Sequence, residues 1–534
     1  MAFRPNPVQY QQLSLFDGYQ MLTHKKQKML ESSWAPVFRN DILSKIDEEP
    51  FRKLFDEEGS ASRPNSPVNV LVGAAILKQL FGLSENQLIQ NINFDIRYAY
   101  ALNLDSLSED TFSIRTYERF IGKLAMHLEE TGEDLIKLTM LSLSDDLAKI
   151  MNIDKTERRM DSFMIDMSAK DMSRRELLYK AIKGFVSYLF LIEDTEGIKH
   201  MEHYTTDGDQ NVVLYHCPEQ YKQYRDEVLL KDASQLTDRY GDRFADEKAY
   251  QVFNRIVNEQ TIIDTETGSR RFRARTDGGL NSSIAQSTTD MDATFRSKAG
   301  KSHKGYVANV EESVGDNGSL ITHYDLRTNN TSDKEMLSDR IKESDVQDKK
   351  TTIVADGAYD SDEIRKAAQE KNIEVITTDM TGRDVPIELG VFKMSEDGTN
   401  VITCPKEYTP EECSYDPKTG QCTATFKTSQ CEHCPYSQAC KPKGKGARRK
   451  VTISIKRVRR AIQQSKLHGE EHSKYSRFRN GVETIPSFFR YVLNVDNMRA
   501  FSLVRNRIFF GLDVMAFNAM KIFGFRRREQ VAYA

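Results

Sequence analysis

The alternation of apolar and polar positions divides the chain into predicted helices, strands and loops. Residues 1–150 show mostly helical spacing, and the strongest predicted helix is Val68–Leu80. Ser84 and Gln87 have the spacing of a capping box, and Ser108 is expected to begin a further helix. Several short helices with tight turns favour a helical N-terminal domain that binds DNA, although most helical domains of this size bind none.

Strand-like segments follow, and two of them carry an aspartate. Residues 157–167 contain Asp161, and a buried-looking strand that starts at Thr351 ends at Asp356. A turn rich in Gly, Asp and Asn at residues 315–318 separates two alternating runs and predicts a hairpin. The other predicted strands are 293–296, 303–310, 319–326 and 373–377, and the other helices are 361–369, 455–467, 482–493 and 497–522. Strand, hairpin, strand, helix, strand is the order of a ribonuclease-H-like mixed sheet, so the predicted fold class is α/β.

Changes in composition predict several domains in the 534 residues. Residues 169–270 are helical and heavily charged, and residues 391–450 are basic and rich in Cys, Pro and Gly. We expect both segments to be insertions into a ribonuclease-H-like catalytic core. The core is expected to comprise residues 151–168 and 271–390, and the helices of residues 451–534 are expected to complete it.

The carboxylate of Glu483 lies between two arginines in the sequence. On a continuous helix of about 3.6 residues per turn, Arg479, Glu483 and Arg490 fall on one face. Pro486 is tolerated only in the first turn of a helix, so we expect a helix to start near Gly481. Glu483 then lies in the first turn, and Arg490 becomes a safer partner on its face than Arg479. The alternative for Arg479 and Glu483 is an ordinary ion pair four residues apart.

Three carboxylates on separate elements suit the transfer of a phosphodiester. Asp161, Asp356 and Glu483 are the candidate ligands of two Mg²⁺ (or Mn²⁺) ions held about 4 Å apart. Mg²⁺ prefers oxygen ligands and binds through only a few carboxylates. Any three of the 79 acidic residues would prove little by themselves. The alternatives to Asp161 are Asp166, Asp290 and Asp292.

Six of the seven cysteines lie between residues 404 and 440. Cys431 and Cys434 form a Cys-x2-Cys pair, with Cys440 six residues later, which is typical of a structural Zn²⁺ site. The fourth ligand is open among Cys404, Cys413 and Cys422, with His433 as a further possibility. The alternative is a set of reduced cysteines without metal, since an odd count argues against a disulfide framework.

The net charge is −3, but the positive charge is concentrated in basic runs near residues 441–460 and 526–528. Such runs beside an acidic site favour an enzyme that acts on DNA, and the alternative is a solvated surface. The residues expected to contact DNA are Lys304, Arg479 and Arg490 near the site and Arg448, Arg449 and Arg459 farther from it. No run approaches the ~20 apolar residues of a membrane span, and no apolar signal opens the chain, so a cytoplasmic protein is expected.

These motifs resemble the DDE transposases of bacterial insertion sequences. The chain looks most like the group numbered eleven eighty-two, which is related to the insertion-sequence-four and Tn-five types. The segments that carry the resemblance are Asn69–Leu104, Asp161–Ser162, Thr289–Thr294, Lys304–Asn309, Val354–Tyr359, the cysteine cluster and the Glu483 segment. The family's three acidic positions fall on Asp161, Asp356 and Glu483. Arg479-x3-Glu483-x6-Arg490 keeps the family spacing, with arginine in place of lysine, but Ser476 stands where the family has tyrosine.

The resemblance implies cut-and-paste transposition of double-stranded DNA, with cleavage at the element ends and attack of a 3′-hydroxyl on the target. Pairing of two element ends favours a homodimer on DNA on mechanistic grounds alone, and the expected location is the nucleoid in the cytoplasm. The resemblance favours Cys404 as the fourth Zn²⁺ ligand, because relatives carry Cys-Pro where this chain has Cys404-Pro405. The competing hypotheses are a metal-dependent nuclease of the same fold without strand transfer, and a catalytically inactive DNA-binding protein derived from a transposase.

Overall fold

The chain divides into two compact units in its structure, a computed structural model. The first unit comprises Met1–Glu157, Asp161–Met336 and Ile485–Ala534, and the second comprises Arg158–Met160 and Leu337–Thr484. The residues that the structure describes are 3–6, 19–55, 65–104, 111–241, 243–298, 300–378, 384–467, 470–498 and 500–532.

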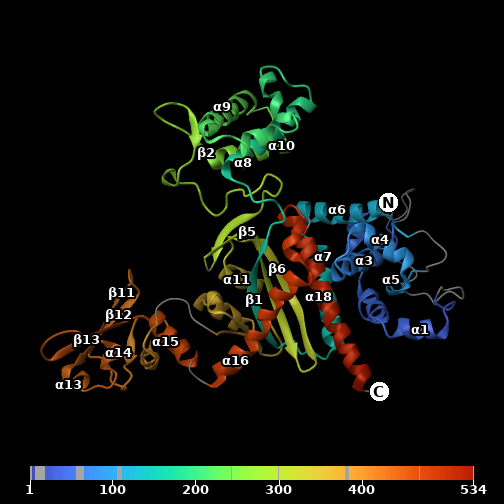
Figure 1. The fold of residues 1–534 in the computed structure, drawn as a ribbon. Helices are drawn as coiled ribbons and strands as arrows, with labels where there is room; N and C mark the ends of the chain where they lie inside the picture. Colours follow the sequence, from blue (N-terminus) through green and yellow to red (C-terminus); the bar gives the residue numbers. More distant parts are fainter. Residues whose placement is uncertain are drawn as a thin grey trace. The chain divides into compact units, whose positions relative to one another are not determined.

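Helices begin the first unit, as the helical spacing predicts (Figure 1). Its principal N-terminal helices are α1 (His24–Glu31), α3 (Val68–Leu80), α4 (Glu85–Phe94), α5 (Ile96–Ala101), α6 (Ile114–Thr131) and α7 (Leu135–Ile150). The predicted helix Val68–Leu80 is confirmed, and so is the capping box of Ser84 and Gln87 at the start of α4. The expected start at Ser108 lies outside the described residues, and α6 instead begins after Ser113, whose side chain accepts the N–H of Thr116.

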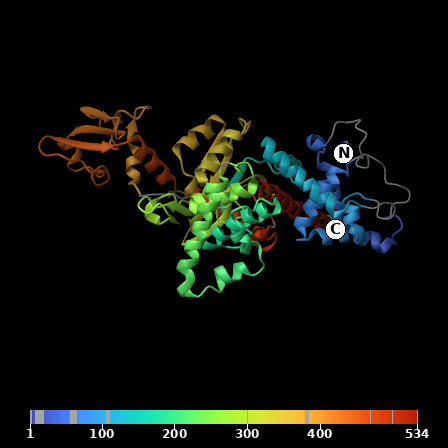
Figure 2. The same ribbon diagram turned by 90° about the horizontal axis from the view of Figure 1, so that it is seen from above.

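The C-terminal helix α18 (Leu503–Ala532) packs against α3, α7 and strand β6 (Gly318–Thr328) of the same unit (Figure 2). Residues Leu503–Val531 are long and apolar enough to cross a membrane by length and composition, contrary to the expectation from the sequence that no segment is. However, 72% of the apolar window is buried inside the protein. A helix that is apolar on all sides is also typical of a core, so burial accounts for its composition.

Residues between the first two strands of the sheet form a helical group with its own apolar core. Its helices are α8 (Arg174–Leu191), α9 (Lys222–Tyr240) and α10 (Lys248–Gln260), followed by the short antiparallel strands β2 (Thr261–Ile263) and β3 (Arg270–Phe272). The core is rich in aromatic rings, with Phe185 in contact with the rings of Tyr250 and Phe253. The prediction of a charged helical stretch here is confirmed by α8 to α10.

A mixed sheet contains both the strand that carries Asp161 and the strand that Asp356 follows. Its strands are β1 (Glu157–Asp166), β4 (Thr294–Lys298), β5 (Lys301–Gly315), β6, β7 (Thr351–Ala355) and β8 (Ile373–Thr377). They are hydrogen bonded in the order β4-β5-β1-β7-β8, and β6 pairs with β5. The predicted hairpin is confirmed, because β5 and β6 pair antiparallel up to Gly315 and Gly318. The strand β7 pairs parallel with β8.

Gly305 in β5 makes an approach to β1 that a side chain would prevent. Its φ of +148° lies in the region that favours glycine, and a Cβ there would lie 2.3 Å from the main-chain oxygen of Ile165. We therefore expect Gly305→Ala to lower the free energy of unfolding by about 2 kcal/mol, measured by denaturant titration. Gly122→Ala in α6 is the control, because no atom lies within 4 Å of a Cβ built there. Equal stability of the two variants would contradict the expected clash.

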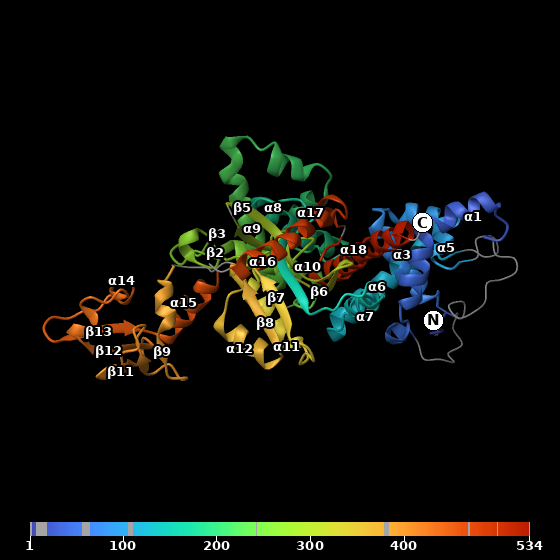
Figure 3. The ribbon, with the colours of Figure 1, turned by 90° about the horizontal axis from the view of Figure 1, so that it is seen from below.

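The second unit contains β7, β8 and the helix α12 (Asp362–Glu370), which packs on β8 (Figure 3). Its core is formed by apolar side chains of β7, β8 and α12, joined by Met160 of β1 and by Leu337 and Ile341 of α11 (Asp333–Glu343). The predicted strand at Thr351 and the predicted strand at 373–377 are confirmed. The predicted helix at 361–369 is also confirmed, because Ser361 is the N-cap of α12.

A second apolar core of this unit lies in the cysteine-containing part of the chain. The strands there are β9 (Lys393–Met394), β10 (Val401–Thr403), β11 (Glu412–Asp416), β12 (Gln421–Lys427) and β13 (Arg448–Ile453). The helices are α13 (Thr428–Cys431), α14 (Ser437–Cys440), α15 (Ile455–Leu467) and α16 (Glu470–Asn480). The order β11-β12-β13 is antiparallel throughout, and the inner face of β12 packs Cys422, Ala424 and Phe426 into the core.

Candidate active site

Asp356 follows directly after β7, as the sequence predicts. Its side chain caps the 3₁₀ turn η9 (Gly357–Tyr359) by accepting the N–H of Ala358 through Oδ1. An aspartate is a favourable cap because its oxygen satisfies an N–H that lacks a partner within the turn. One oxygen of Asp356 is thus used by the main chain, and Oδ2 faces the guanidinium of Arg479.

Glu483 lies at a break between two helices. The helix α16 ends at Asn480, the 3₁₀ turn η11 spans Gly481–Glu483, and α17 spans Thr484–Tyr491. The prediction that Pro486 lies in the first turn of a helix is confirmed, because α17 starts two residues before it. The expectation that Arg479, Glu483 and Arg490 share one helical face is wrong, since η11 interrupts the helical path between them.

Arg479, rather than Arg490, is the partner of Glu483. Nη1 of Arg479 lies 3.0 Å from Oε1 of Glu483, whereas Arg490 donates to the main-chain oxygen of Met164 at 2.7 Å and pairs with Asp496 at 3.4 Å. The preference for Arg490 is therefore wrong. The physical reason is that the guanidinium of Arg490 satisfies a carbonyl of β1, while Arg479 in the last turn of α16 points to the carboxylate four residues later.

The guanidinium of Arg479 contacts the carboxylates of both Asp356 and Glu483, which lie in the second unit. Nη2 of Arg479 lies 3.9 Å from Oδ2 of Asp356, on the side of the guanidinium other than the Glu483 contact. The Arg479 side chain is only 15% exposed, whereas those of Asp356 and Glu483 are 37% and 57% exposed. Because α16 lies against β7, these residues are held within one unit. Asp356 and Glu483 are therefore arranged so that a single cation can contact both.

Asp161 lies in β1, where its Oδ1 accepts the N–H of Ser162. Side chains alternate between the faces of a strand, so Arg159 and Phe163 share the face of Asp161. Arg159 donates to the main-chain oxygen of Phe478 at 2.8 Å. The rings of Phe163 and Phe489 have centroids 5.7 Å apart. The neighbours of Asp161 on its face of β1 thus contact residues on both sides of Glu483 in the sequence.

The alternative aspartates have other partners. Asp290 accepts the hydroxyl of Tyr306 at 2.5 Å, and burial raises the pKa of this carboxyl. Asp292 accepts the N–H of Leu503 at 2.8 Å and so caps α18. Asp166 lies 3.3 Å from a ring nitrogen of His303 and donates its N–H to Asp496 at 3.1 Å. These contacts give Asp290 and Asp292 roles in holding the first unit together.

The residues predicted to contact DNA differ in the partners that they have within the protein. Lys304 pairs with Asp171, and Arg448 lies 3.4 Å from Glu411. Arg449 donates to the main-chain oxygen of Gly444 at 2.8 Å. Arg459 lies on the partly exposed side of α15. The side chain of Arg448 is 68% exposed, so it is accessible to a DNA phosphate.

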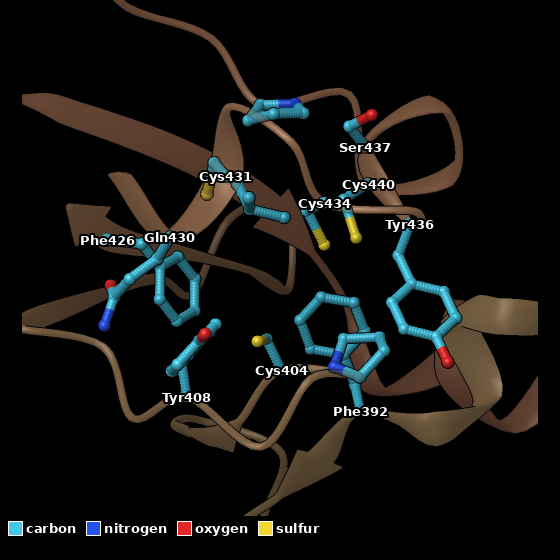
Figure 4. Close-up of a pocket in the computed structure, with 13 residues that line it drawn as sticks. Phe392, Cys404, Tyr408, Phe426, Gln430, Cys431, Cys434, Tyr436, Ser437 and Cys440 are labelled. Carbon is cyan, nitrogen blue, oxygen red and sulfur yellow. The ribbon is translucent and has the colours of Figure 1, made fainter. Parts of the chain in front are cut away.

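Four cysteines line one pocket in the second unit, and they are the four that the sequence and its resemblance select. Cys404, Cys431, Cys434 and Cys440 lie around it together with the rings of Phe392, Tyr408 and Tyr436 (Figure 4). Burial raises the pKa of Cys440 to about 12 and also raises the pKa of Cys431, and the neighbouring thiols add to both shifts. The protonated form of the Cys431 and Cys440 thiols is therefore favoured over the thiolate when no cation is bound.

The two remaining cysteines of this region lie elsewhere. The Sγ of Cys413 accepts the N–H of Val401 at 3.5 Å, and the Sγ of Cys422 lies 3.2 Å from the oxygen of Gly398. Both are on β11 and β12, away from the lining of the four-cysteine pocket. Among the described residues, no group of three or more His, Cys, Asp or Glu side chains is placed so that it could hold a metal ion.

Two residues of the site were not assigned a role from the sequence. Arg159 contacts the segment of Glu483, and Gly481 gives it the room to do so. The spacing Arg159-x-Asp161 places both side chains on one face of a strand, which is the only sequence signal that could have drawn attention to Arg159. Gly481 carries no such signal, because the need for a glycine depends on a residue more than 300 positions away.

Two family models match the chain. Residues 403–523 match a model described as a transposase DDE domain, and residues 27–123 match a model described as a transposase domain. The first match includes Glu483 and all four cysteines of the pocket. Together they support a transposase of the bacterial insertion-sequence type, and DDE transposases act on DNA with divalent metal ions such as Mg²⁺. No curated protein and no solved structure matches the chain.

Proposed function

We propose that the protein is a DDE transposase of the insertion-sequence eleven-eighty-two group that cleaves DNA and transfers the cut strand to a target. The observation that carries this proposal is the contact of one guanidinium, that of Arg479, with both Asp356 and Glu483. Carboxylates that share a cation in this way can also share a metal ion. The family matches give this pair of residues its chemical context.

We propose Asp161 as the third carboxylate. Arg159 and Phe163 lie on its face of β1, and they contact Phe478 and Phe489, which precede and follow Glu483 in the sequence. This pattern supports Asp161 over Asp290 and Asp292, whose carboxylates accept hydrogen bonds from Tyr306 and from the start of α18.

In this proposal the two Mg²⁺ (or Mn²⁺) ions, when bound, activate an oxygen nucleophile and stabilise the leaving oxygen of the DNA strand. The residues of the chain do the positioning. Asp356 and Glu483 would hold the ions in place of the guanidinium of Arg479, which would then be available for a DNA phosphate. Arg490 holds the end of β1 through the Met164 carbonyl, so it supports the strand that carries Asp161.

The sheet supports a ribonuclease-H-like core. Along the chain, β1, the hairpin of β5 and β6, β7, α12 and β8 follow the order strand, hairpin, strand, helix, strand. In this proposal residues 169–270 and 391–450 are insertions into the core, residues 1–150 bind DNA and residues 451–534 complete the core. We also propose a cytoplasmic, nucleoid-associated protein that forms a homodimer on paired element ends.

We propose that Cys404, Cys431, Cys434 and Cys440 hold a structural Zn²⁺ ion. Four thiols around one pocket match the ligand set of a tetrahedral zinc site. Most of their neighbours in the pocket are aromatic or aliphatic, and the ion would cross-link the segments that line it. Because zinc binds thiolates and the pKa values of the Cys431 and Cys440 thiols are raised, uptake of the ion is expected to release protons and to strengthen as the pH rises.

Contacts to DNA phosphates from Lys304, Arg448, Arg449, Arg459, Arg479 and Arg490 predict strong salt dependence. Raising the salt from about 0.05 M to 0.2 M is expected to weaken binding about 10³-fold, measured by fluorescence anisotropy with a labelled duplex. Arg448→Ala is expected to lower the salt slope by about one, whereas Lys222→Ala in α9 leaves it unchanged. Binding that is unchanged at 0.2 M salt contradicts these contacts.

A strand-transfer assay tests the proposed activity against its alternatives. The purified protein is incubated with Mg²⁺ and with intact or pre-cleaved DNA that carries the ends of the element. A transposase is expected to cleave the intact DNA and to join the pre-cleaved ends to a target. Cleavage without joining identifies a nuclease of the same fold, and binding without either reaction identifies an inactive DNA-binding protein.

A further inference from the structure

Arg159 of β1 makes three contacts with the chain segment that leads to Glu483. Its Nη1 donates to the main-chain oxygen of Phe478 at 2.8 Å, and its guanidinium lies 5.6 Å from the centroid of the Phe478 ring. The guanidinium also passes so close to Gly481 that a Cβ built there would lie 1.8 Å from Nη1. All of these residues belong to the second unit.

The end of α16 explains why a cation lies there. Phe478 is in the last turn of the helix, where main-chain carbonyls lack partners within the helix and the helix dipole is negative. The guanidinium of Arg159 satisfies one such carbonyl and neutralises part of the dipole. Gly481 immediately follows the helix and begins the turn η11, and Glu483 ends that turn. The absence of a side chain at Gly481 allows the guanidinium to lie against the turn.

We infer that Arg159 and Gly481 together fix the position of the Glu483 carboxylate, an inference that rests on the proposed catalytic role of Glu483. Arg159 is a positioning residue, because it acts on Glu483 through the turn. It lies two residues before Asp161 on the same face of β1. Metal ligands need to be held within about 0.5 Å of their working geometry, which a flexible turn does not achieve alone.

A double-mutant cycle on the full-length protein tests the inference through Mn²⁺ binding, measured as free Mn²⁺ by electron paramagnetic resonance. Arg159→Ala removes the donor, and Gly481→Ala places a methyl group where the guanidinium lies. Each is expected to weaken Mn²⁺ binding about tenfold, the lower end of the loss seen when support of a metal ligand is removed.

The double variant is the decisive member of the cycle. It is expected to bind Mn²⁺ as weakly as Arg159→Ala alone, because the new methyl group has room once the guanidinium is gone. The inference is overturned if the losses of Mn²⁺ affinity in the two single variants multiply in the double variant. It is also overturned if either single variant folds and binds Mn²⁺ as tightly as the wild type. Arg159→Lys keeps a cation at the helix end in a smaller volume, so it is expected to recover part of the affinity and to allow the test if Gly481→Ala fails to fold.

Two controls separate this inference from the proposed function. Gly184 lies at an exposed position of α8, and no atom lies within 4 Å of a Cβ built there. The Gly184→Ala protein is therefore expected to bind Mn²⁺ like the wild type. Asp356→Asn removes a proposed ligand. If it abolishes Mn²⁺ binding while the Arg159 and Gly481 variants bind normally, the positioning role is wrong and the metal site stands. If it leaves Mn²⁺ binding intact, the proposed metal site itself is wrong.

Discussion

Asp356→Asn is expected to abolish DNA cleavage and strand transfer while DNA binding persists. Loss of a residue that merely supports a metal ligand lowers activity about 10- to 100-fold, so loss of a ligand is expected to lower it by more than 100-fold. The substitution removes the negative charge that a Mg²⁺ ion needs. DNA binding persists because phosphate contacts come from basic residues elsewhere, and removing a nearby negative charge does not weaken them.

Asparagine is the informative replacement because it preserves the local fold. Asp356 caps the turn η9 through an oxygen that accepts the N–H of Ala358, and asparagine is as good a cap as aspartate. A labelled duplex reports cleavage on a denaturing gel, and anisotropy reports binding. Asp362→Asn, six residues along the chain in α12, is the matched control, since Asp362 forms an ion pair with Arg365 of the same helix and the variant is expected to keep full activity. Cleavage by the Asp356→Asn protein would falsify the assignment of the active site.

Cys434→Ser is expected to remove bound zinc and to unfold the region around the four-cysteine pocket. Serine has nearly the same shape as cysteine, but its hydroxyl does not supply the thiolate that zinc requires. Structural zinc contributes about 10–16 kcal/mol to folding in zinc-finger peptides at pH 7, so the apolar core beside the pocket is not expected to compensate. Atomic emission measures the zinc content, and limited proteolysis reports cleavage between residues 384 and 467.

Cys217→Ser is the matched control for the zinc prediction. Cys217 lies in the helical group of the first unit, where its Sγ lies 3.7 Å from the oxygen of Pro218, and it does not line the pocket. The zinc content and the proteolysis pattern of the Cys217→Ser protein are expected to equal those of the wild type. A Cys434→Ser protein that retains zinc, or a wild-type protein that contains none, contradicts the proposed site and leaves a group of reduced cysteines.

Three of the four cysteines of the pocket could be predicted from the residues alone, but the fourth could not. The Cys-x2-Cys pair and Cys440 are close in sequence, so their grouping follows from local geometry. Cys404 is separated from them by the two strands β11 and β12, and the residues alone left Cys413 and Cys422 equally open. The structure groups Cys404 with the other three because the pairing of β11 with β12 holds Cys413 and Cys422 apart from the pocket.

The Glu483 segment shows the opposite case, in which a local pattern misled. Helical periodicity placed Arg490 on the face of Glu483, but periodicity holds only along an unbroken helix. The turn η11 breaks the helix, and the carbonyl of Met164 in β1 provides Arg490 with another partner. The sequence could not predict this partner, because Met164 lies 326 residues away from Arg490.

The sequence by itself determined the elements whose stability depends on near neighbours. These are the apolar helix Val68–Leu80, the cap of Ser84 and Gln87, the hairpin of β5 and β6, and the strand that ends at Asp356. Only the tertiary structure decided that Arg479 contacts both Asp356 and Glu483, and that Gly481 makes room for Arg159. Such contacts depend on where separate elements meet. The free energy that brings elements together comes mainly from burial of apolar surface. Because burial is non-directional, it does not specify individual polar partners.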